Sequence, residues 1–173
     1  AGSLTKPMIS VITLQLVEEG RLSLDDTLPT VLPENITGKF ANSEQITVHM
    51  LLNHTGGLPE FIDLALGDIL SNPDKVWREE EFLDYAATRE SSFAPGETIA
   101  YVNTDYTLLG MIIEEATGQS WRQEMRERIF EPLRLENTLL PAVDDVTIPG
   151  DHARGYGDFG SGVFDATEAV NAS

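Results

Sequence analysis

The chain has no cysteine, and only three of its 173 residues are histidines. Without cysteine, neither a disulfide nor a thiolate metal site can form, and the redox compartment cannot be inferred. His49, His54 and His152 do not have the spacing of metal ligands. We therefore expect no metal site.

Long apolar runs and positive charge are also scarce. No apolar run approaches the roughly 20 residues needed to cross a bilayer, so no membrane span is expected. The first residues lack the basic start and cleavage site of a signal peptide, and the sequence leaves the localisation open. The chain has 11 basic and 29 acidic residues, a net charge of −18. This balance argues against nucleic acid or an anionic membrane as a partner.

The length and the hydrophobic pattern predict a mainly α-helical fold. A chain of 173 residues can bury one core, so residues 1–173 are expected to form a single helical domain or subdomain. Apolar periodicity and capping residues predict about five to six helices, with loops from about residue 135 onward and little sheet. The expected helical segments are Thr5–Glu19, Val48–Asn53, Phe61–Leu70, Glu79–Thr88, Thr104–Thr117 and 120–131. Of these, Phe61–Leu70 is expected to be either a helix or a loop.

A Ser-x-x-Lys motif, Ser3 to Lys6, leads directly into the first predicted helix. Residues three apart on a helix share one face, so the serine hydroxyl and the lysine amine can meet. An amine within hydrogen-bond reach can accept the hydroxyl proton and activate serine as a nucleophile. Pro7 lacks an N–H group and is harmless only in a first turn, which places the helix start at this motif. The alternative is a capping serine followed by a solvated lysine.

A second motif, Tyr101-Val102-Asn103, lies between the Pro95-Gly96 turn and the helix predicted over Thr104–Thr117. A tyrosine has an ordinary pKa of about 10, so it acts as a base near neutrality only beside a cation such as Lys6. The Asn103 amide offers a donor and an acceptor to a substrate amide or to Lys6. The alternative is a buried tyrosine, with Asn103 capping the helix. We interpret His54-Thr55-Gly56 as a turn that ends the preceding helix.

With these motifs, the sequence resembles the class C β-lactamase and DD-peptidase family of penicillin-recognising serine hydrolases, which includes related esterases and D-aminopeptidases. The resemblance extends to about Tyr156. It rests on an ordered series of stretches: Gly2–Lys6, Leu16–Asp26, Leu51–Pro59, Pro95-Gly96, Tyr101–Tyr106 and Ile129–Leu133.

The resemblance implies a role for each motif residue. Ser3 would be the acylated nucleophile, Lys6 its proton partner, Tyr101 the general base or acid, and Asn103 a ligand of the substrate amide. The reaction would be acyl transfer to serine followed by hydrolysis, on a small-molecule or peptide substrate with an amide, ester or lactam bond. The resemblance implies that this reaction needs no cofactor. The sequence does not decide between these substrates.

Family members are longer, and carry an antiparallel sheet with a third motif on one strand. This chain is therefore expected to be the helical half of such a fold, without the sheet half. One oxyanion donor, the Ser3 N–H, is present; a missing second donor typically costs about 10²–10³ in rate. We expect the parent protein to be a serine hydrolase and this polypeptide alone to be inactive or nearly so.

An uncovered apolar helix face predicts a further behaviour, either dimerisation or binding of a sheet-bearing fragment. This face also supports a rival hypothesis. In that hypothesis the chain is a catalytically silent helical module that binds a partner, and Ser3 and Tyr101 are remnants. The two hypotheses differ in geometry, because only the enzyme requires Ser3, Lys6 and Tyr101 to converge on one cleft.

Overall fold

The computed structural model describes residues 2–72, 75–140, 147–158, 162–165 and 167. The α-helices are α1 (Thr5–Glu18), α2 (Leu28–Val31), α3 (Glu34–Thr37), α4 (Val48–Leu52), α5 (Ile62–Ser71), α6 (Glu79–Ala86), α7 (Asn103–Thr117) and α8 (Trp121–Met125). Two 3-10 turns, η1 (Gly2–Leu4) and η2 (Ser43–Gln45), a π-helical turn, η3 (Arg126–Phe130), and two strands, β1 (Tyr156–Asp158) and β2 (Val163–Asp165), complete the described elements.

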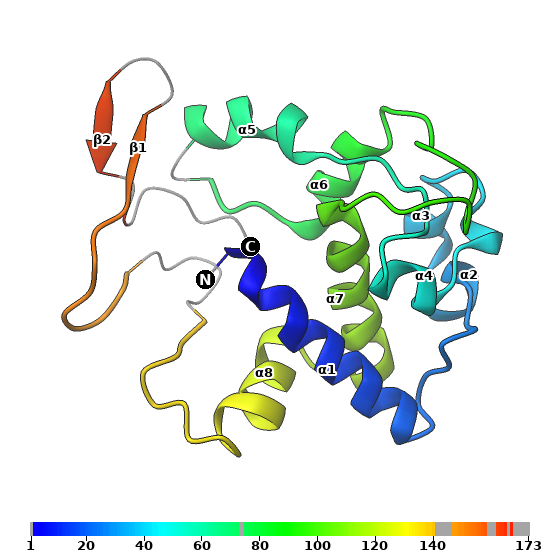
Figure 1. The fold of residues 1–173 in the computed structure, drawn as a ribbon, viewed down its shortest axis with the longest axis horizontal. Coiled ribbons are helices and arrows are strands. Elements are labelled where there is room, and N and C mark those ends of the chain that lie inside the picture. Colours follow the sequence, from blue (N-terminus) through cyan, green and yellow to red (C-terminus); the bar gives the residue numbers. More distant parts are fainter. Residues whose placement is uncertain (1, 73–74, 141–146, 159–161, 166, 168–173) are drawn as a thin grey trace.

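Helix α7 lies at the centre of the helical body and contacts α1, α2, α4, α6 and α8 (Figure 1). Four of its apolar residues are fully buried because they repeat with helical spacing on the faces that meet these neighbours: Leu108, Leu109, Ile112 and Ile113. Helix α1 crosses in front of α7 in this view and contributes Ile9, Ile12 and Leu16 to the same core. The N-terminal ends of two long helices are thereby fixed relative to each other.

The predicted helix ends are largely confirmed. The polypeptide leaves α1 through Gly20 and α7 through Gly118, both with positive φ, as glycine allows without a Cβ clash. The Thr47 hydroxyl accepts a hydrogen bond from the Met50 N–H at the start of α4. Ser120 accepts one from the Gln123 N–H at the start of α8 in the same way. Short polar residues and glycines thus delimit these helices.

The mainly helical prediction with little sheet is confirmed, but the number of helices is not. The described residues contain eight α-helices, because two single-turn helices, α2 and α3, form between the first two predicted segments. Four residues are too few for a hydrophobic period to be recognised. Pro29 lies in the first turn of α2 and Pro33 is the residue before α3, positions that proline tolerates.

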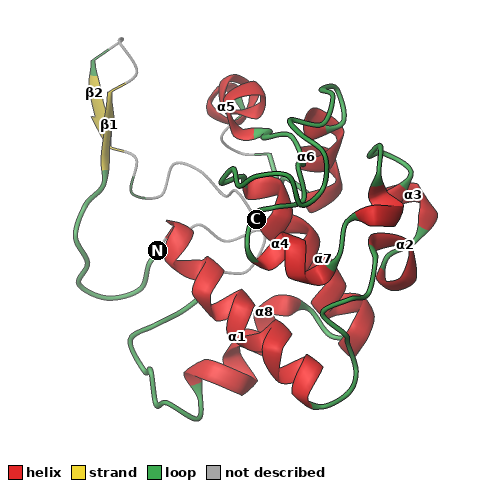
Figure 2. Ribbon diagram, turned by 45° about the vertical axis from the view of Figure 1, so that its right-hand side comes forward, coloured by secondary structure: helices red, strands yellow, loops and turns green. Residues whose placement is uncertain are grey.

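The region from about residue 135 was expected to be rich in loops, and its described residues also contain a short β-hairpin. Strand β1 pairs antiparallel with β2, with Tyr156 opposite Asp165. The hairpin stands apart from the helices in both Figure 1 and Figure 2. With three residues per strand, the sequence shows too little alternation to predict it.

The outer side of α1 is apolar and exposed. Leu4, just before the helix, and Val11 and Leu14 within it recur at helical spacing and are between 45% and 69% exposed. The opposite side carries the buried residues Ile12 and Leu16. Helix α1 therefore has two apolar faces, of which only one is covered by the described residues.

This contrast predicts different costs for two leucines of one helix. We expect Leu16→Ala to lower the free energy of unfolding by about 2–5 kcal/mol, because it opens a cavity in the core. The matched control Leu14→Ala removes the same atoms from a side chain that is 49% exposed, and should change stability by no more than about 0.5 kcal/mol. Urea unfolding followed by circular dichroism measures both. Equal losses in the two variants would contradict this packing.

Candidate active site

The first turn of α1 brings Ser3 and Lys6 to the centre of the candidate site. Ser3 lies in the 3-10 turn η1 and Lys6 is the second residue of α1, so the helix begins where Pro7 requires. The Lys6 Nζ donates a hydrogen bond of 3.4 Å to the Ser3 Oγ. A second, shorter bond of 2.7 Å goes from Nζ to the Asn103 Oδ1 on α7. Lysine therefore connects the serine to the N-terminal end of the central helix.

Tyr101 completes the predicted constellation. Its hydroxyl donates a hydrogen bond of 2.7 Å to the Ser3 Oγ, across 98 residues of sequence. The Lys6 Nζ lies 5.0 Å from the centre of the Tyr101 ring and 5.7 Å from that of Tyr106. The side chains of all four predicted site residues thus converge.

The alternative interpretations of the second motif are wrong. Tyr101 is 56% exposed, not buried. Asn103 is the first residue of α7 and not its cap. Its amide oxygen faces Lys6, and its amide nitrogen donates a hydrogen bond of 3.0 Å to the Glu60 Oε2.

The electrostatics favour proton transfer between Ser3 and Tyr101. Hydrogen bonding to Lys6 is the largest cause that lowers the pKa of Tyr101 below its usual value, and hydrogen bonding to Ser3 is the next. Together they outweigh the opposite effect of partial burial. A phenolate is thereby more accessible near neutral pH than in a free tyrosine. Since the phenol oxygen and the serine oxygen already share a hydrogen bond, a phenolate here can accept the Ser3 proton.

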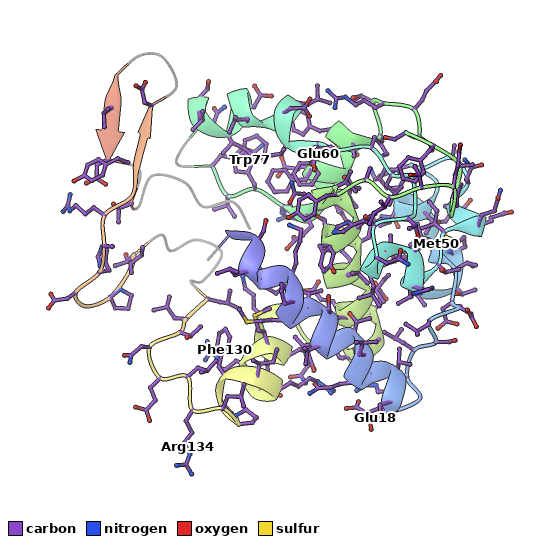
Figure 3. All side chains as sticks on the ribbon, in the orientation of Figure 1. Glu18, Met50, Glu60, Trp77, Phe130 and Arg134 are labelled. Carbon is purple, nitrogen blue, oxygen red and sulfur yellow. The ribbon has the colours of Figure 1, made fainter. Side chains whose placement is uncertain are left out.

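Glu60 is a site residue that the sequence analysis missed. Its Oε2 accepts hydrogen bonds from the backbone N–H and the side-chain amide of Asn103, at 2.8 and 3.0 Å. Its Oε1 accepts from the backbone N–H groups of Phe61 and Ile62, where α5 begins. One carboxylate therefore satisfies the N-terminal ends of α5 and α7 and orients the Asn103 oxygen toward Lys6. Figure 3 shows Glu60 beside the N-terminal end of α7.

His54 and Asp105 form a second missed feature. The predicted end of α4 at His54-Thr55-Gly56 is confirmed, since Thr55 N–H bonds to the Met50 carbonyl. The His54 side chain, however, extends toward α7, where its Nδ1 lies 2.7 Å from the Asp105 Oδ2. Both residues lie in stretches that carry the family resemblance, but a pairing across 51 positions leaves no periodic signal in one sequence.

Among the residues that the structure describes, no group of three or more histidine and carboxylate side chains is arranged to hold a metal ion. Within the same residues, no helix combines the length and apolar character needed to span a bilayer.

Comparison with known proteins now identifies the family. The family model named Beta-lactamase matches residues 1–168, and the chain belongs to this family. This confirms the resemblance that the sequence motifs indicated. Penicillin-binding protein 4 of Amycolatopsis lactamdurans is 34% identical over 141 residues, which is 80% of this chain and 35% of that protein.

Two solved structures are similar over nearly the whole chain. A D-stereospecific amidohydrolase from Streptomyces sp. has a TM-score of 0.89 and 31% identity. The match covers 98% of this chain and 52% of the amidohydrolase chain. The D-amino acid amidase from Ochrobactrum anthropi SV3, complexed with L-phenylalanine amide, has a TM-score of 0.76 and 32% identity. The match covers 96% of this chain and 46% of the amidase chain. The chain therefore spans about a third of the curated relative and about half of these two structures.

Burial of Asp105 gives a testable pH dependence. Burial is the largest cause that raises the pKa of Asp105 from 3.8 to about 6, and the hydrogen bond to His54 opposes it. Between about pH 4 and pH 6 the folded protein therefore holds a proton that the unfolded chain has lost, so stability falls as the pH rises through this window. We expect Asp105→Asn, which cannot ionise, to gain stability relative to the wild type from pH 4 to pH 6 and to level off above.

Unfolding free energies in urea at a series of pH values measure this difference. The matched control is Asp25→Asn, which removes an exposed carboxylate. A stability difference between Asp105→Asn and wild type that stays constant with pH would contradict the assignment.

Proposed function

We propose that Ser3 is the nucleophile of a serine hydrolase that works through an acyl-enzyme. The observation that carries this proposal is the 2.7 Å contact between the Tyr101 hydroxyl and the Ser3 Oγ, with Lys6 beside both. A silent helical module gives no reason for these side chains to converge, so the geometry favours the enzyme over that rival.

In the first step, Tyr101 as phenolate accepts the Ser3 proton while Oγ attacks the substrate carbonyl carbon. Lys6 keeps the phenolate favourable and connects it to Asn103. The backbone N–H of Ser3, at the positive end of the α1 dipole, stabilises the negative oxygen of the tetrahedral intermediate. When the carbon–nitrogen bond of an amide breaks, Tyr101 returns its proton to the departing amine.

In the second step, water attacks the Ser3 ester and gives up a proton to Tyr101. The carbon–Oγ bond breaks, Ser3 recovers its proton, and a carboxylic acid leaves. Asn103 would bind the substrate amide through the amide hydrogen that Glu60 does not accept.

We propose amide or lactam carbonyls as the substrate class. The support comes from relatives that are named for such compounds, namely a penicillin-binding protein, a D-stereospecific amidohydrolase and a D-amino acid amidase. Because the chain spans only part of each, the parent protein's substrate is inferred by this likeness alone.

We further propose that a sheet covers the exposed face of α1 in the active protein, and that the 173-residue polypeptide alone has little activity. The exposed Leu4, Val11 and Leu14 support this, because such a stripe is favourable only against another apolar surface. In this proposal the sheet helps to orient the substrate and supplies the second oxyanion donor, so activity depends on it.

Acylation of Ser3 tests the hydrolase proposal. We expect intact mass spectrometry to detect a fluorophosphonate or fluorescent penicillin adduct on the full gene product, and slow or no adduct formation on the 173-residue polypeptide. Ser3→Ala should abolish the adduct, and Tyr101→Phe should slow it by about 10²–10⁴ because the base is lost.

The matched control is Tyr156→Phe, which removes an exposed hydroxyl on β1 and should leave the rate unchanged. An adduct that forms equally fast in Ser3→Ala would contradict the role of Ser3. Fast acylation of the isolated polypeptide would contradict its proposed inactivity.

The exposed face of α1 gives a prediction about assembly. We expect the 173-residue polypeptide to show a mass above that of a monomer in light scattering at high concentration, since association hides the apolar stripe. Leu14→Glu should shift it toward the monomer, whereas Val163→Glu, at an exposed position on β2, should not. A monomeric wild type at every concentration would contradict this.

A further inference from the structure

His54 contacts the segment that carries Tyr101 through both its backbone and its side chain. Its backbone adopts φ of 62°, an unusual conformation for a residue other than glycine. Its carbonyl accepts a 3.0 Å hydrogen bond from the N–H of Ala100, the residue before Tyr101. Its ring centre lies 4.8 Å from that of Tyr101 and 5.1 Å from that of Tyr106. The histidine thus contacts both the backbone and the ring that deliver the phenol.

Asp105 fixes the orientation of the imidazole. The 2.7 Å contact joins Nδ1 of His54 to Oδ2 of Asp105, and the two side chains are 13% and 1% exposed. A ring held at one nitrogen in a buried setting cannot rotate freely, so its face against Tyr101 is set by the carboxylate. Asp105 lies two residues after Asn103 in α7, which ties this support to the site itself.

The carboxylate is costly where it lies. The other oxygen of Asp105, Oδ1, is buried without a hydrogen-bond partner among the described residues. An unsatisfied buried acceptor lowers stability, and an apolar residue at this position would avoid the cost. The contact to His54 is the one hydrogen bond of the Asp105 side chain in the described structure, which makes orientation of that ring its evident use.

We propose that His54 and Asp105 are a positioning pair that holds the Tyr101 phenol against the Ser3 Oγ. Neither residue touches the serine; both act through the tyrosine. The consequence for catalysis rests on the proposed function, whereas the geometric claim does not. The charged groups that also face this region are Lys6 on α1 and Glu60 before α5, and both remain in every variant below.

The ionisation of Tyr101 reports its position. The pKa of this phenol is lowered only while the hydroxyl stays beside Lys6 and Ser3. A ring that loses its support leaves them, and its pKa then returns toward 10. A general loss of stability, in contrast, leaves the pKa of a still-folded protein unchanged.

The experiment is a pH titration of the 173-residue chain with ¹³C-labelled tyrosine, followed by NMR at the ring Cζ, with the Tyr101 signal assigned from Tyr101→Phe. We expect His54→Asn, which tolerates positive φ, to raise the pKa of Tyr101 by at least about half a unit. Asp105→Asn, which replaces a charge-assisted hydrogen bond by a neutral one, should raise it by less. The matched control His49→Asn, on α4, should leave it unchanged.

An unchanged Tyr101 pKa in folded His54→Asn and Asp105→Asn would overturn the proposal. If His54→Asn does not fold, Asp105→Asn decides alone, because it keeps the shape of the buried side chain. The titration uses no substrate. Failure of Ser3 to react with a penicillin would therefore leave the positioning pair intact, and an unchanged titration would leave the hydrolase proposal intact.

Discussion

The hydrogen bond from the Lys6 ammonium to the Asn103 amide oxygen is the contact on which the candidate site depends. At 2.7 Å it joins the first turn of α1 to the first residue of α7, two helices that also meet through apolar packing and a 2.9 Å hydrogen bond between Ser10 and Tyr106. Apolar packing alone permits small shifts along the helix axes, whereas a charge-assisted hydrogen bond specifies one register. The position of Ser3 relative to Tyr101 follows from that register.

Two carboxylates orient the side chains around this contact. Glu60 orients the Asn103 amide and satisfies the N-terminal ends of two helices, and Asp105 orients His54 behind Tyr101. The Glu60 carboxylate therefore lies where two helix N-terminal ends favour negative charge, whereas burial disfavours the charge on Asp105. Fold and chemistry share these residues, so a change at Glu60 affects both.

The sequence predicted the parts of this arrangement that local patterns encode. The period of α1, the position of Pro7 and the glycines after α1 and α7 are local, and the structure follows them. The Ser-x-x-Lys and Tyr-x-Asn motifs predicted the four candidate site residues, because the family resemblance placed the two motifs in one site. Glu60 and the His54–Asp105 pair were missed because their partners lie 43 and 51 residues away, where one sequence gives no signal. The single-turn helices and the three-residue strands were too short for any period.

The most direct test of the account is a crystal structure of the full gene product after reaction with a fluorophosphonate. We predict continuous density from the Ser3 Oγ to phosphorus, with the Tyr101 hydroxyl within hydrogen-bond distance of that oxygen and Lys6 still bonded to Asn103. Phosphorus on another residue, or a Tyr101 ring turned away from a modified Ser3, would contradict it.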